Sequence, residues 1–321
     1  MSEPARVVTV GMQRSGTTLF ATLLRAQPET SFLPDYLGSF LGAMAATNAS
    51  WRSPLEAPAR RTALAMVRDE LLRFGTVLLL EADSFRTIDD LHREALRQLG
   101  GAGLRVVGHK MLLSPSGIER LLDETDVTAV LLLRDPRDAA SSAQVRFGGG
   151  VERFVEEWRA LASLARSHGT HPRLVVLRFE DLVAAPDAAL ARLGDALGIA
   201  FAPVGGPRTF VGRGGRESAW RENSSFGDLR EDVDPAAIGR WRSCPDSPVV
   251  RYAAFRCGDL LEGFGYERGP RLGRVERGRL ASHYAAHRLA NGLEGAGQRL
   301  STIVRRTFGE LEPRGASRRS P

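Results

Sequence analysis

The sequence predicts an α/β protein in which a parallel sheet is flanked by helices. Short apolar runs alternate with amphipathic stretches from the start of the chain, which is the pattern of βαβ units. The runs VVTV, AVLLL and LVVL are almost continuously apolar, as expected of strands buried on both faces. At 321 residues the chain is long enough to bury a substantial core. We therefore expect one α/β domain over residues 1–267, followed by a helical extension over residues 268–321.

Five strands and six helices are predicted from these patterns. The strands are Val7 to Val10, Val77 to Leu80, Leu104 to Val107, Ala129 to Leu133 and Leu174 to Leu177. The helices are Thr17 to Ala26, Thr87 to Leu99, Pro115 to Leu122, Arg137 to Arg146, Val151 to Ser167 and Asp187 to Leu197. The segment from Ala202 to Gly215 is rich in Gly and Pro, and it is predicted to be a long loop that covers a ligand site.

The basic charge of the chain lies in its C-terminal extension. The net charge is +6, but residues 268–321 hold twelve Arg and four Glu, a balance of +8. The rest of the chain is therefore slightly acidic, and no nucleic-acid partner is expected. The extension is expected to be helical where Leu289, Leu293 and Leu300 recur at helical spacing, to be disordered over residues 313–321, and to serve in docking.

The sequence also argues against several classes of protein. No apolar run approaches the ~20 residues that cross a bilayer, and the N-terminus has no signal-peptide core, so a cytoplasmic protein is expected. The two cysteines, Cys244 and Cys257, are too few for a disulfide framework and lack the spacing of a zinc site. We expect no metal at the functional site.

A glycine-rich turn follows the first predicted strand and leads into a helix. The backbone N–H groups of such a turn and the dipole of the helix together form an anion site. The turn, GMQRSGTT at residues 11–18, matches the nucleotide-triphosphate loop G-x-x-x-x-G-K-[ST], except that Thr17 replaces the lysine. The loop is therefore poorly suited to a γ-phosphate, whereas Arg14 within it is able to reach the terminal group of a shorter donor.

The segment QRSGTTL, residues 13–19, resembles the 5′-phosphosulfate loop of sulfotransferases that use 3′-phosphoadenosine 5′-phosphosulfate (PAPS). The usual form of that loop is P-[KR]-S-G-T-T followed by an apolar residue, and only Gln13 departs from it. The resemblance implies a P-loop NTPase-like sheet flanked by helices and a sulfuryl transfer that releases PAP. It also implies that the loop binds the donor through Arg14, Ser15, Gly16, Thr17, Thr18 and Leu19.

A second segment resembles the 3′-phosphate site of the same family. In LLLRDPRDAASS, residues 131–142, Arg134 stands at a predicted strand end and Ser142 follows eight residues later, as in the family. An arginine offers a bidentate fork to phosphate oxygens, and a serine hydroxyl two helical turns on adds a donor. Arg146 lies one turn past Ser142 on the same helix face and is expected to join them.

Two later segments extend the resemblance over about residues 6–266. The sequence EDL at residues 180–182 resembles the Y-E-D-L turn of the family, with Phe179 in place of the tyrosine. The step from Ser225 to Arg240 fits the segment that closes over the donor in the tyrosylprotein and bacterial branches. The R-K-G-x-x-G-D-W-K segment of cytosolic steroid and phenol sulfotransferases is absent from the sequence.

Sulfuryl transfer needs cations at the leaving oxygen and a base for the acceptor proton. Arg14 is suited to the first role, and so is Lys110, which is the only lysine in the chain and follows a predicted strand. In the family a lysine from this region contacts the bridging oxygen. Asp35 lies 21 residues past Arg14, which is the offset of a catalytic Glu in the tyrosylprotein branch. By analogy with the Lys-x-His of cytosolic members, His109 is the alternative base, but adjacent residues in a strand point to opposite faces.

Two other functions use the same arrangement of strand, loop and helix. An ATP-dependent kinase or NTPase needs the missing loop lysine and a Mg²⁺ site. A non-catalytic nucleotide-binding protein keeps both phosphate pockets but has no use for Asp35 and Lys110. The acceptor is expected to be a hydroxyl of a metabolite, a glycan or a lipid head group, with a peptidyl tyrosine as the alternative.

Overall fold

The structure is a computed structural model of the 321-residue chain. It describes the main chain of residues 3–36, 38–73, 76–100, 103–147, 151–204, 210–211, 217–218, 235–269, 272–283 and 285–286. The chain divides into two units, residues 1–270 and 271–321. In the second unit, residues 274–283 are helical, and the predicted stripe from Leu289 onward lies outside the described residues.

The first unit is built on a parallel sheet of five strands in the order β2-β3-β1-β4-β5. The central strand β1 (Ala5–Gly11) pairs with β3 (Val106–Lys110) on one side and with β4 (Thr128–Leu133) on the other. The sheet is completed by β2 (Thr30–Tyr36) beside β3 and β5 (Leu174–Arg178) beside β4. The predicted parallel α/β fold is confirmed.

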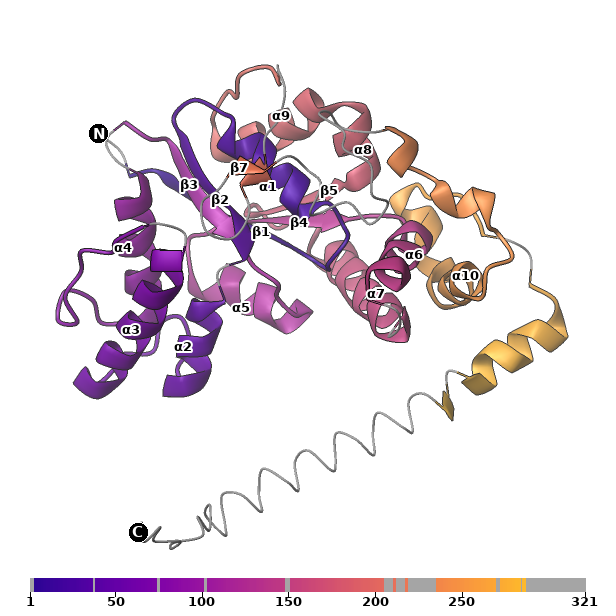
Figure 1. Ribbon diagram of the computed structural model, residues 1–321, viewed down its shortest axis with the longest axis horizontal. Coiled ribbons are helices and arrows are strands. Elements are labelled where there is room, and N and C mark those ends of the chain that lie inside the picture. Colours follow the sequence, from indigo (N-terminus) through magenta and orange to yellow (C-terminus); the bar gives the residue numbers. More distant parts are fainter. Residues whose placement is uncertain are drawn as a thin grey trace, which may run out of the picture. The chain divides into compact units, whose positions relative to one another are not determined.

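Helices cover both faces of this sheet (Figure 1). On one face, α1, α8 and α9 pack on apolar side chains of β1, β4 and β5. On the other face lie α5 and α7. The helices of the first unit are α1 (Thr17–Arg25), α2 (Ser39–Thr47), α3 (Ala57–Arg73), α4 (Ile88–Gly100), α5 (Pro115–Glu124), α6 (Pro136–Phe147), α7 (Val151–His168), α8 (Phe179–Ala184), α9 (Pro186–Leu197) and α10 (Pro248–Leu261). All six predicted helices are present within about two residues of the expected ends.

The edge strand β2 was not predicted, because the run TSFLPDY contains Pro34. Proline has no N–H for the ladder and is therefore confined to edge strands and irregular positions. Both conditions hold here, since β2 pairs only with β3 and its register shifts between Leu33 and Tyr36. The strand carries Asp35 to the same edge of the sheet as Lys110, which pairs with Tyr36.

The predicted strand from Val77 to Leu80 is wrong. This extended segment lies outside the sheet, and side chains satisfy its backbone in place of a neighbouring strand. The amide of Gln98 donates to the Leu79 carbonyl (2.7 Å) and accepts from the Leu79 N–H (2.8 Å), while Arg68 donates to the carbonyls of Leu78 and Leu80. The side chains of Val77 and Leu79 are largely exposed. An apolar run is therefore not enough to identify a buried strand.

Short elements also lie outside the main sheet. Two short strands, β6 (Phe210–Val211) and β7 (Glu217–Ser218), pair antiparallel, and most of the loop predicted from Ala202 to Gly215 lies outside the described residues. Short 3-10 turns at Pro235–Ala237 and Arg240–Ser243 precede α10. None of the described helices is long and apolar enough to cross a membrane.

We predict that Gly108→Ala destabilises the protein severely, because there is no room for a Cβ where Gly108 of β3 pairs with Val7 of β1. A Cβ at this position would lie 2.0 Å from the carbonyl oxygen of Val7 and 2.5 Å from the ring of Phe32. The backbone of the central strand cannot move aside cheaply, so the free energy of unfolding should fall by about 3 kcal/mol or more. Urea unfolding followed by circular dichroism measures this change.

Gly258→Ala is the matched control for this experiment. Gly258 lies in α10, and a Cβ there would meet nothing within 4 Å. Alanine should therefore raise the free energy of unfolding by about 0.5–1 kcal/mol, because it restricts the unfolded chain and favours the helix. Equal effects of the two substitutions would contradict the close approach of β3 and β1.

Candidate active site

The phosphate loop joins the end of β1 to the first turn of α1. Gly16 precedes the helix with a φ of +94°, and a Cβ there would lie 2.4 Å from the ring of Phe179, so only glycine fits without a shift. Ser15 is fully buried and donates from its hydroxyl to the Met12 carbonyl at 2.7 Å, which closes the turn. Thr17 begins the helix and is also buried, as is Leu19. The loop thus has the local structure that the sequence predicts.

Arg14 reaches from this loop to helix α6. Its backbone has a φ of +69°, which is uncommon for a residue other than glycine and is found most often at functional sites. The Nε atom of Arg14 donates to the hydroxyl of Ser142 at 3.1 Å. The two residues are 128 positions apart in the sequence. The two predicted phosphate motifs therefore meet in the folded chain.

Arg134 follows β4 and connects the loop to the turn at Pro235–Ala237. Its guanidinium donates to the Arg14 carbonyl (3.1 Å) and to the Ala237 carbonyl (2.8 Å). The guanidinium also stacks on the ring of Phe179, 4.4 Å from the ring centre. Its Nε atom is buried and has no hydrogen-bond partner among the described residues. The Nε–H group of Arg134 is thus able to donate a hydrogen bond to a further acceptor.

The charges at this site are mainly positive. Burial, together with the repulsion of the cations Arg134 and Arg146, lowers the pKa of Arg14 to about 10. Burial also lowers the pKa of Arg134, with Arg240 acting in the same direction, whereas the attraction of Asp138 and Glu180 opposes the shift. Gathering like charges in a partly buried site is costly unless an anion neutralises them. The cluster is therefore suited to an anionic ligand.

Lys110 ends β3 and brings a further cation to the phosphate loop. Its ammonium group donates to the Thr18 hydroxyl in the first turn of α1 at 3.0 Å. The strand ends of β1, β3 and β4 are adjacent because β1 pairs with both neighbours. In parallel sheets this carboxyl edge is where ligands bind. The backbone of Asp35 lies at this edge too, but its side chain is outside the described part of the structure.

His109 lies in the interior, on the face of β3 away from the phosphate loop. The ring is fully buried, and its Nε2 atom lies 2.8 Å from the Nε2 atom of His92 in α4. Burial lowers the pKa of His109 to about 4 and lowers the pKa of His92 well below its ordinary value. Both ring nitrogens of His109 are engaged, since Nδ1 lies 3.2 Å from the Lys110 carbonyl. The alternation of side chains along the strand therefore separates His109 from Lys110.

The sequence did not identify the residues that anchor the segment at 235–241. The buried carboxylate of Asp138 accepts hydrogen bonds from the backbone N–H groups of Gly239 (2.6 Å) and Trp241 (2.8 Å). Arg137 is fully buried, forms a salt bridge with Asp135 and stacks on Trp241, 3.7 Å from the ring centre. The acidic residues Asp135 and Asp138 in the run RDPRD are the feature of the sequence from which this anchoring could have been predicted. Of the two predicted residues nearby, Arg240 lies close enough to Arg134 to shift its pKa, and Ser225 lies outside the described residues.

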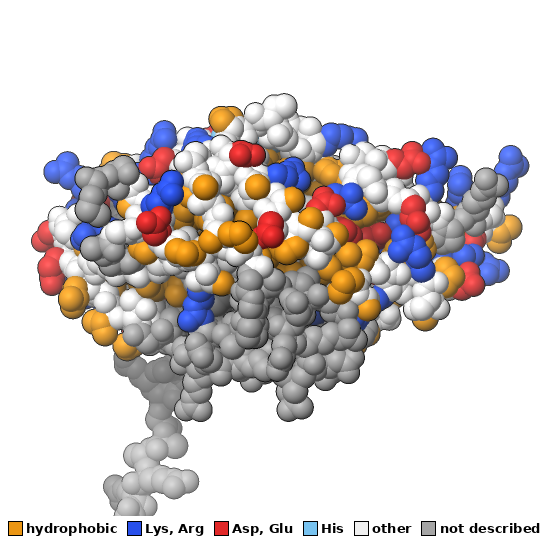
Figure 2. Space-filling view, turned by 90° about the horizontal axis from the view of Figure 1, so that it is seen from above, with side chains coloured by type: hydrophobic (Ala, Val, Ile, Leu, Met, Phe, Trp, Pro, Cys, Tyr) orange, Lys and Arg blue, Asp and Glu red, His pale blue; other side chains and the backbone are white. Residues whose placement is uncertain are grey.

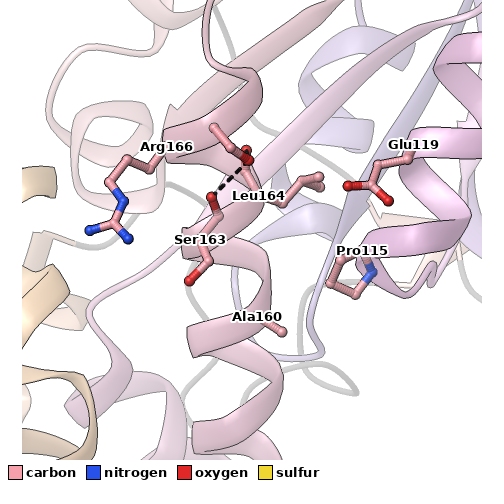
Figure 3. Close-up of a pocket in the computed structure, with 7 residues that line it drawn as sticks. Pro115, Glu119, Ala160, Ser163, Leu164 and Arg166 are labelled. Carbon is pink, nitrogen blue, oxygen red and sulfur yellow. Dashed lines mark hydrogen bonds between the residues drawn. The ribbon is translucent and has the colours of Figure 1, made fainter.

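Two other surface features do not belong to this site. A pocket of about 580 Å³ lies between α5 and α7, and its labelled residues in Figure 3 include none of the predicted site residues. On the face seen in Figure 2, acidic and basic side chains are interspersed and do not gather by sign. Within the described part of the chain, no group of three His, Cys, Asp or Glu side chains is placed to hold a metal ion.

Comparisons with known proteins identify the family. The model of the sulfotransferase family matches residues 5–203. The chain therefore belongs to the sulfotransferase family, and the resemblance seen in its phosphate loop is confirmed. It is a sulfuryl-transferring enzyme by family. A search of curated proteins finds no match.

One solved sulfotransferase domain shares the fold, and further solved structures are similar to this chain at lower scores. The sulfotransferase domain from the curacin biosynthetic pathway is 16% identical, with 83% of this chain and 99% of that domain covered and a TM-score of 0.50. The sulfotransferase domain of the olefin synthase of Synechococcus is 17% identical, with 89% and 96% covered and a TM-score of 0.43. Retinol dehydratase, solved with androsterone and the inactive cofactor PAP, is 18% identical, with 85% and 84% covered and a TM-score of 0.43.

The buried histidine pair predicts how stability depends on pH. In the unfolded chain a histidine takes up a proton below a pKa of about 6.5, whereas in the folded chain the pKa of both rings is lower, for His109 about 4. Proton uptake by the unfolded state then favours unfolding. The free energy of unfolding should fall as the pH decreases from about 6.5 to about 5, by roughly 1.4 kcal/mol per pH unit for each histidine.

Urea unfolding at several pH values measures this slope, and His92→Phe is the informative variant. Carboxyl groups whose pKa is raised, such as Asp138 and Glu180, contribute a slope of the opposite sign. Their contribution is the same in the wild type and the variant, so it cancels in the difference between the two. In the variant, the slope of the free energy of unfolding against pH should decrease by the contribution of one histidine or more. His168→Ala, which removes a partly exposed ring, is the control for the loss of a histidine outside the pair. Identical slopes in wild type and His92→Phe would contradict the prediction.

Proposed function

We propose that this protein moves a sulfuryl group from PAPS to an acceptor hydroxyl and releases PAP. The observation that carries the proposal is the contact between Arg14 and Ser142, which joins two anion-binding motifs from distant parts of the sequence. PAPS carries two separate anionic groups, a 5′-phosphosulfate and a 3′-phosphate. A site made of two adjoining cationic pockets suits such a donor better than it suits a single phosphate.

The residues present fit this donor. The N–H groups of the loop, the N-terminus of α1 and the Arg14 side chain would hold the 5′-phosphosulfate, with Thr18 at its edge. The 3′-phosphate would be held by Arg134, Ser142, Arg146 and Arg240. The buried Nε atom of Arg134, which has no partner among the described residues, supports this assignment, because buried donors normally find an acceptor.

The proposed roles in the reaction follow from charge. Arg14 and Lys110 stabilise the negative charge that develops on the leaving oxygen as the bond between it and sulfur breaks. Asp35 accepts the proton of the acceptor hydroxyl while the new bond between that oxygen and sulfur forms. The full burial of His109 and its two engaged ring nitrogens favour Asp35 over His109 as the base.

The acceptor we propose is a hydroxyl of a metabolite, glycan or lipid head group. The alternative functions are an ATP-dependent P-loop kinase or NTPase and a non-catalytic nucleotide-binding protein. Thr17 stands where a triphosphate-binding loop has lysine, which argues against the first. The contact of Lys110 with Thr18 in the phosphate loop supports a role of this cation in transfer, which argues against the second. We further propose a docking role for the basic extension and keep residues 1–267 as the catalytic domain.

The proposal predicts that Arg134→Ala weakens the binding of PAP. A charge-assisted hydrogen bond is worth about 1.5–3 kcal/mol, so affinity measured by calorimetry should fall roughly 10- to 150-fold. Arg97→Ala is the matched control, because Arg97 lies on the surface of α4 and pairs only locally with Glu94. An Arg134→Ala protein that is folded and binds PAP as tightly as the wild type would remove Arg134 from the site.

A second prediction concerns the base. Asp35→Asn should lower the rate of sulfuryl transfer by about 10²- to 10⁴-fold, which is the usual contribution of a general base. Affinity for PAP should stay nearly the same, because the proposed role of Asp35 is toward the acceptor. Transfer from sulfur-labelled PAPS to a panel of hydroxyl acceptors provides the rate, and calorimetry provides the affinity. A fully active Asp35→Asn enzyme would exclude Asp35 as the base.

A further inference from the structure

A chain of buried hydrogen bonds leads from β1 to the backbone of Lys110. Arg6 in β1 lies with its Nη1 atom 3.1 Å from Nδ1 of His92 in α4. Nε2 of His92 lies 2.8 Å from Nε2 of His109, and Nδ1 of His109 lies 3.2 Å from the Lys110 carbonyl. Arg6 is 5% exposed and both histidines are fully buried. The chain therefore runs through the interior and reaches a partly buried carbonyl at its end.

The positions of the protons along this chain follow from the chemistry of its members. A guanidinium only donates, so Nδ1 of His92 must accept and His92 must carry its proton on Nε2. Nε2 of His109 must then accept, and His109 must carry its proton on Nδ1, from which it donates to the Lys110 carbonyl. Every member has one defined role, and both imidazoles are neutral. Hydrogen bonds aligned in this way polarise and strengthen one another.

The surroundings keep both rings neutral and fixed. Phe40 packs edge-on against His92 at 4.8 Å and tilted against His109 at 5.8 Å, and Trp51 packs edge-on against His92 at 5.5 Å. The charged groups that act on His92 are Arg6 from β1 and Arg93 from α4, and both arginines pair with Asp89 in α4 and with Asp126 before β4. Asp89 and Asp126 bind Arg6 and fix its direction.

The chain ends where the sheet is irregular. The pairing of β2 with β3 shifts between Leu33 and Tyr36, beside His109 and Lys110. The peptide group between Lys110 and Met111 is held toward β1, where the Met111 N–H donates to the Thr9 carbonyl at 2.9 Å, whereas the shift disturbs the ladder toward β2. The His109 ring supplies a side-chain hydrogen bond to the Lys110 carbonyl at this place. An apolar pair of equal size would fill the same space without donating to that carbonyl.

We propose that the hydrogen-bond chain Arg6–His92–His109 is a positioning device that orients the Lys110 peptide group and so holds its ammonium group against Thr18. The proposal rests on the proposed function only in assigning Lys110 to the transfer step. His109 touches neither donor nor acceptor in this account. His109 acts by positioning Lys110, whereas a base would accept the proton of the acceptor hydroxyl.

The single lysine of the chain makes a direct test possible. In protein labelled with ¹³C at the lysine Cε, one resonance reports on Lys110 alone. His109→Leu and His92→Phe should shift or broaden this resonance in the free protein and should abolish most of the shift that PAP induces in the wild type. His109→Asn should recover part of the wild-type signal, because its amide keeps an N–H group near the Nδ1 position of His109 but does not reach His92.

Trp51→Phe is the matched control. It alters the packing around His92 but leaves the hydrogen-bond chain in place, so the Lys110 resonance should not move. The proposal is overturned if folded His109→Leu and His92→Phe proteins keep the wild-type resonance, or if Trp51→Phe moves it as far as they do. Failure of the proposed function is separate, because it would appear as wild-type protein that does not bind PAP in calorimetry.

If neither histidine variant folds, the wild-type protein decides the question by acid titration. A proton added to His109 turns its Nε2 atom into a donor, and two donors then face each other. The Lys110 resonance should therefore shift near pH 4, where His109 gains its proton, before near-UV circular dichroism reports unfolding. A resonance that stays unchanged until the protein unfolds would overturn the proposal.

Discussion

The parallel pairing of β1 with β3 and β4 is the constraint on which the candidate site depends. Thr9 pairs with Lys110 on one side, and Gly11 pairs with Leu132 on the other, so three strands end next to one another. The loop that carries Arg14, the ammonium group of Lys110 and the guanidinium of Arg134 all start from these ends. No local stretch of sequence holds all three. The close approach at Gly108 belongs to the same constraint, because it lets β3 lie tightly against the central strand.

Positive charges lie close together at the site, and neighbouring carboxylates partly offset their repulsion. Arg14 and Arg134 are both partly or wholly buried and repel one another, and both have a lowered pKa. Asp138 and Glu180 attract Arg134 and oppose that shift. Asp138 also holds the backbone at 239–241 by two hydrogen bonds. The candidate site and the anchoring segment thus share one buried carboxylate, which links their geometry.

Much of this arrangement could be predicted from the sequence, because its signals are local. The apolar runs of β1, β4 and β5, the glycine-rich turn and the spacing of Arg134 and Ser142 all act within one element and its neighbour. The edge strand β2 was missed because Pro34 is unusual in strands, and the run from Val77 to Leu80 was assigned wrongly because its backbone is satisfied by the side chains of Gln98 and Arg68.

Contacts between distant segments could not be predicted. Nothing in the sequence around His92 on α4 indicates that its ring meets His109 on β3, because the packing of α4 decides this contact. The anchoring of Gly239 by Asp138 spans about one hundred residues in the same way. The position of His109 was predicted in part, since alternation along a strand separates it from Lys110, but its hydrogen bond to the Lys110 carbonyl was not.

The central claim is that two cationic pockets together bind a nucleotide with phosphates at both its 3′ and 5′ positions. Calorimetry with PAP, adenosine 5′-monophosphate and ATP with Mg²⁺ tests this claim most directly. The account predicts that PAP binds at least about tenfold more tightly than adenosine 5′-monophosphate, because the 3′-phosphate adds charge-assisted hydrogen bonds worth about 1.5 kcal/mol or more. Tight binding of ATP with Mg²⁺, together with no binding of PAP, would contradict it.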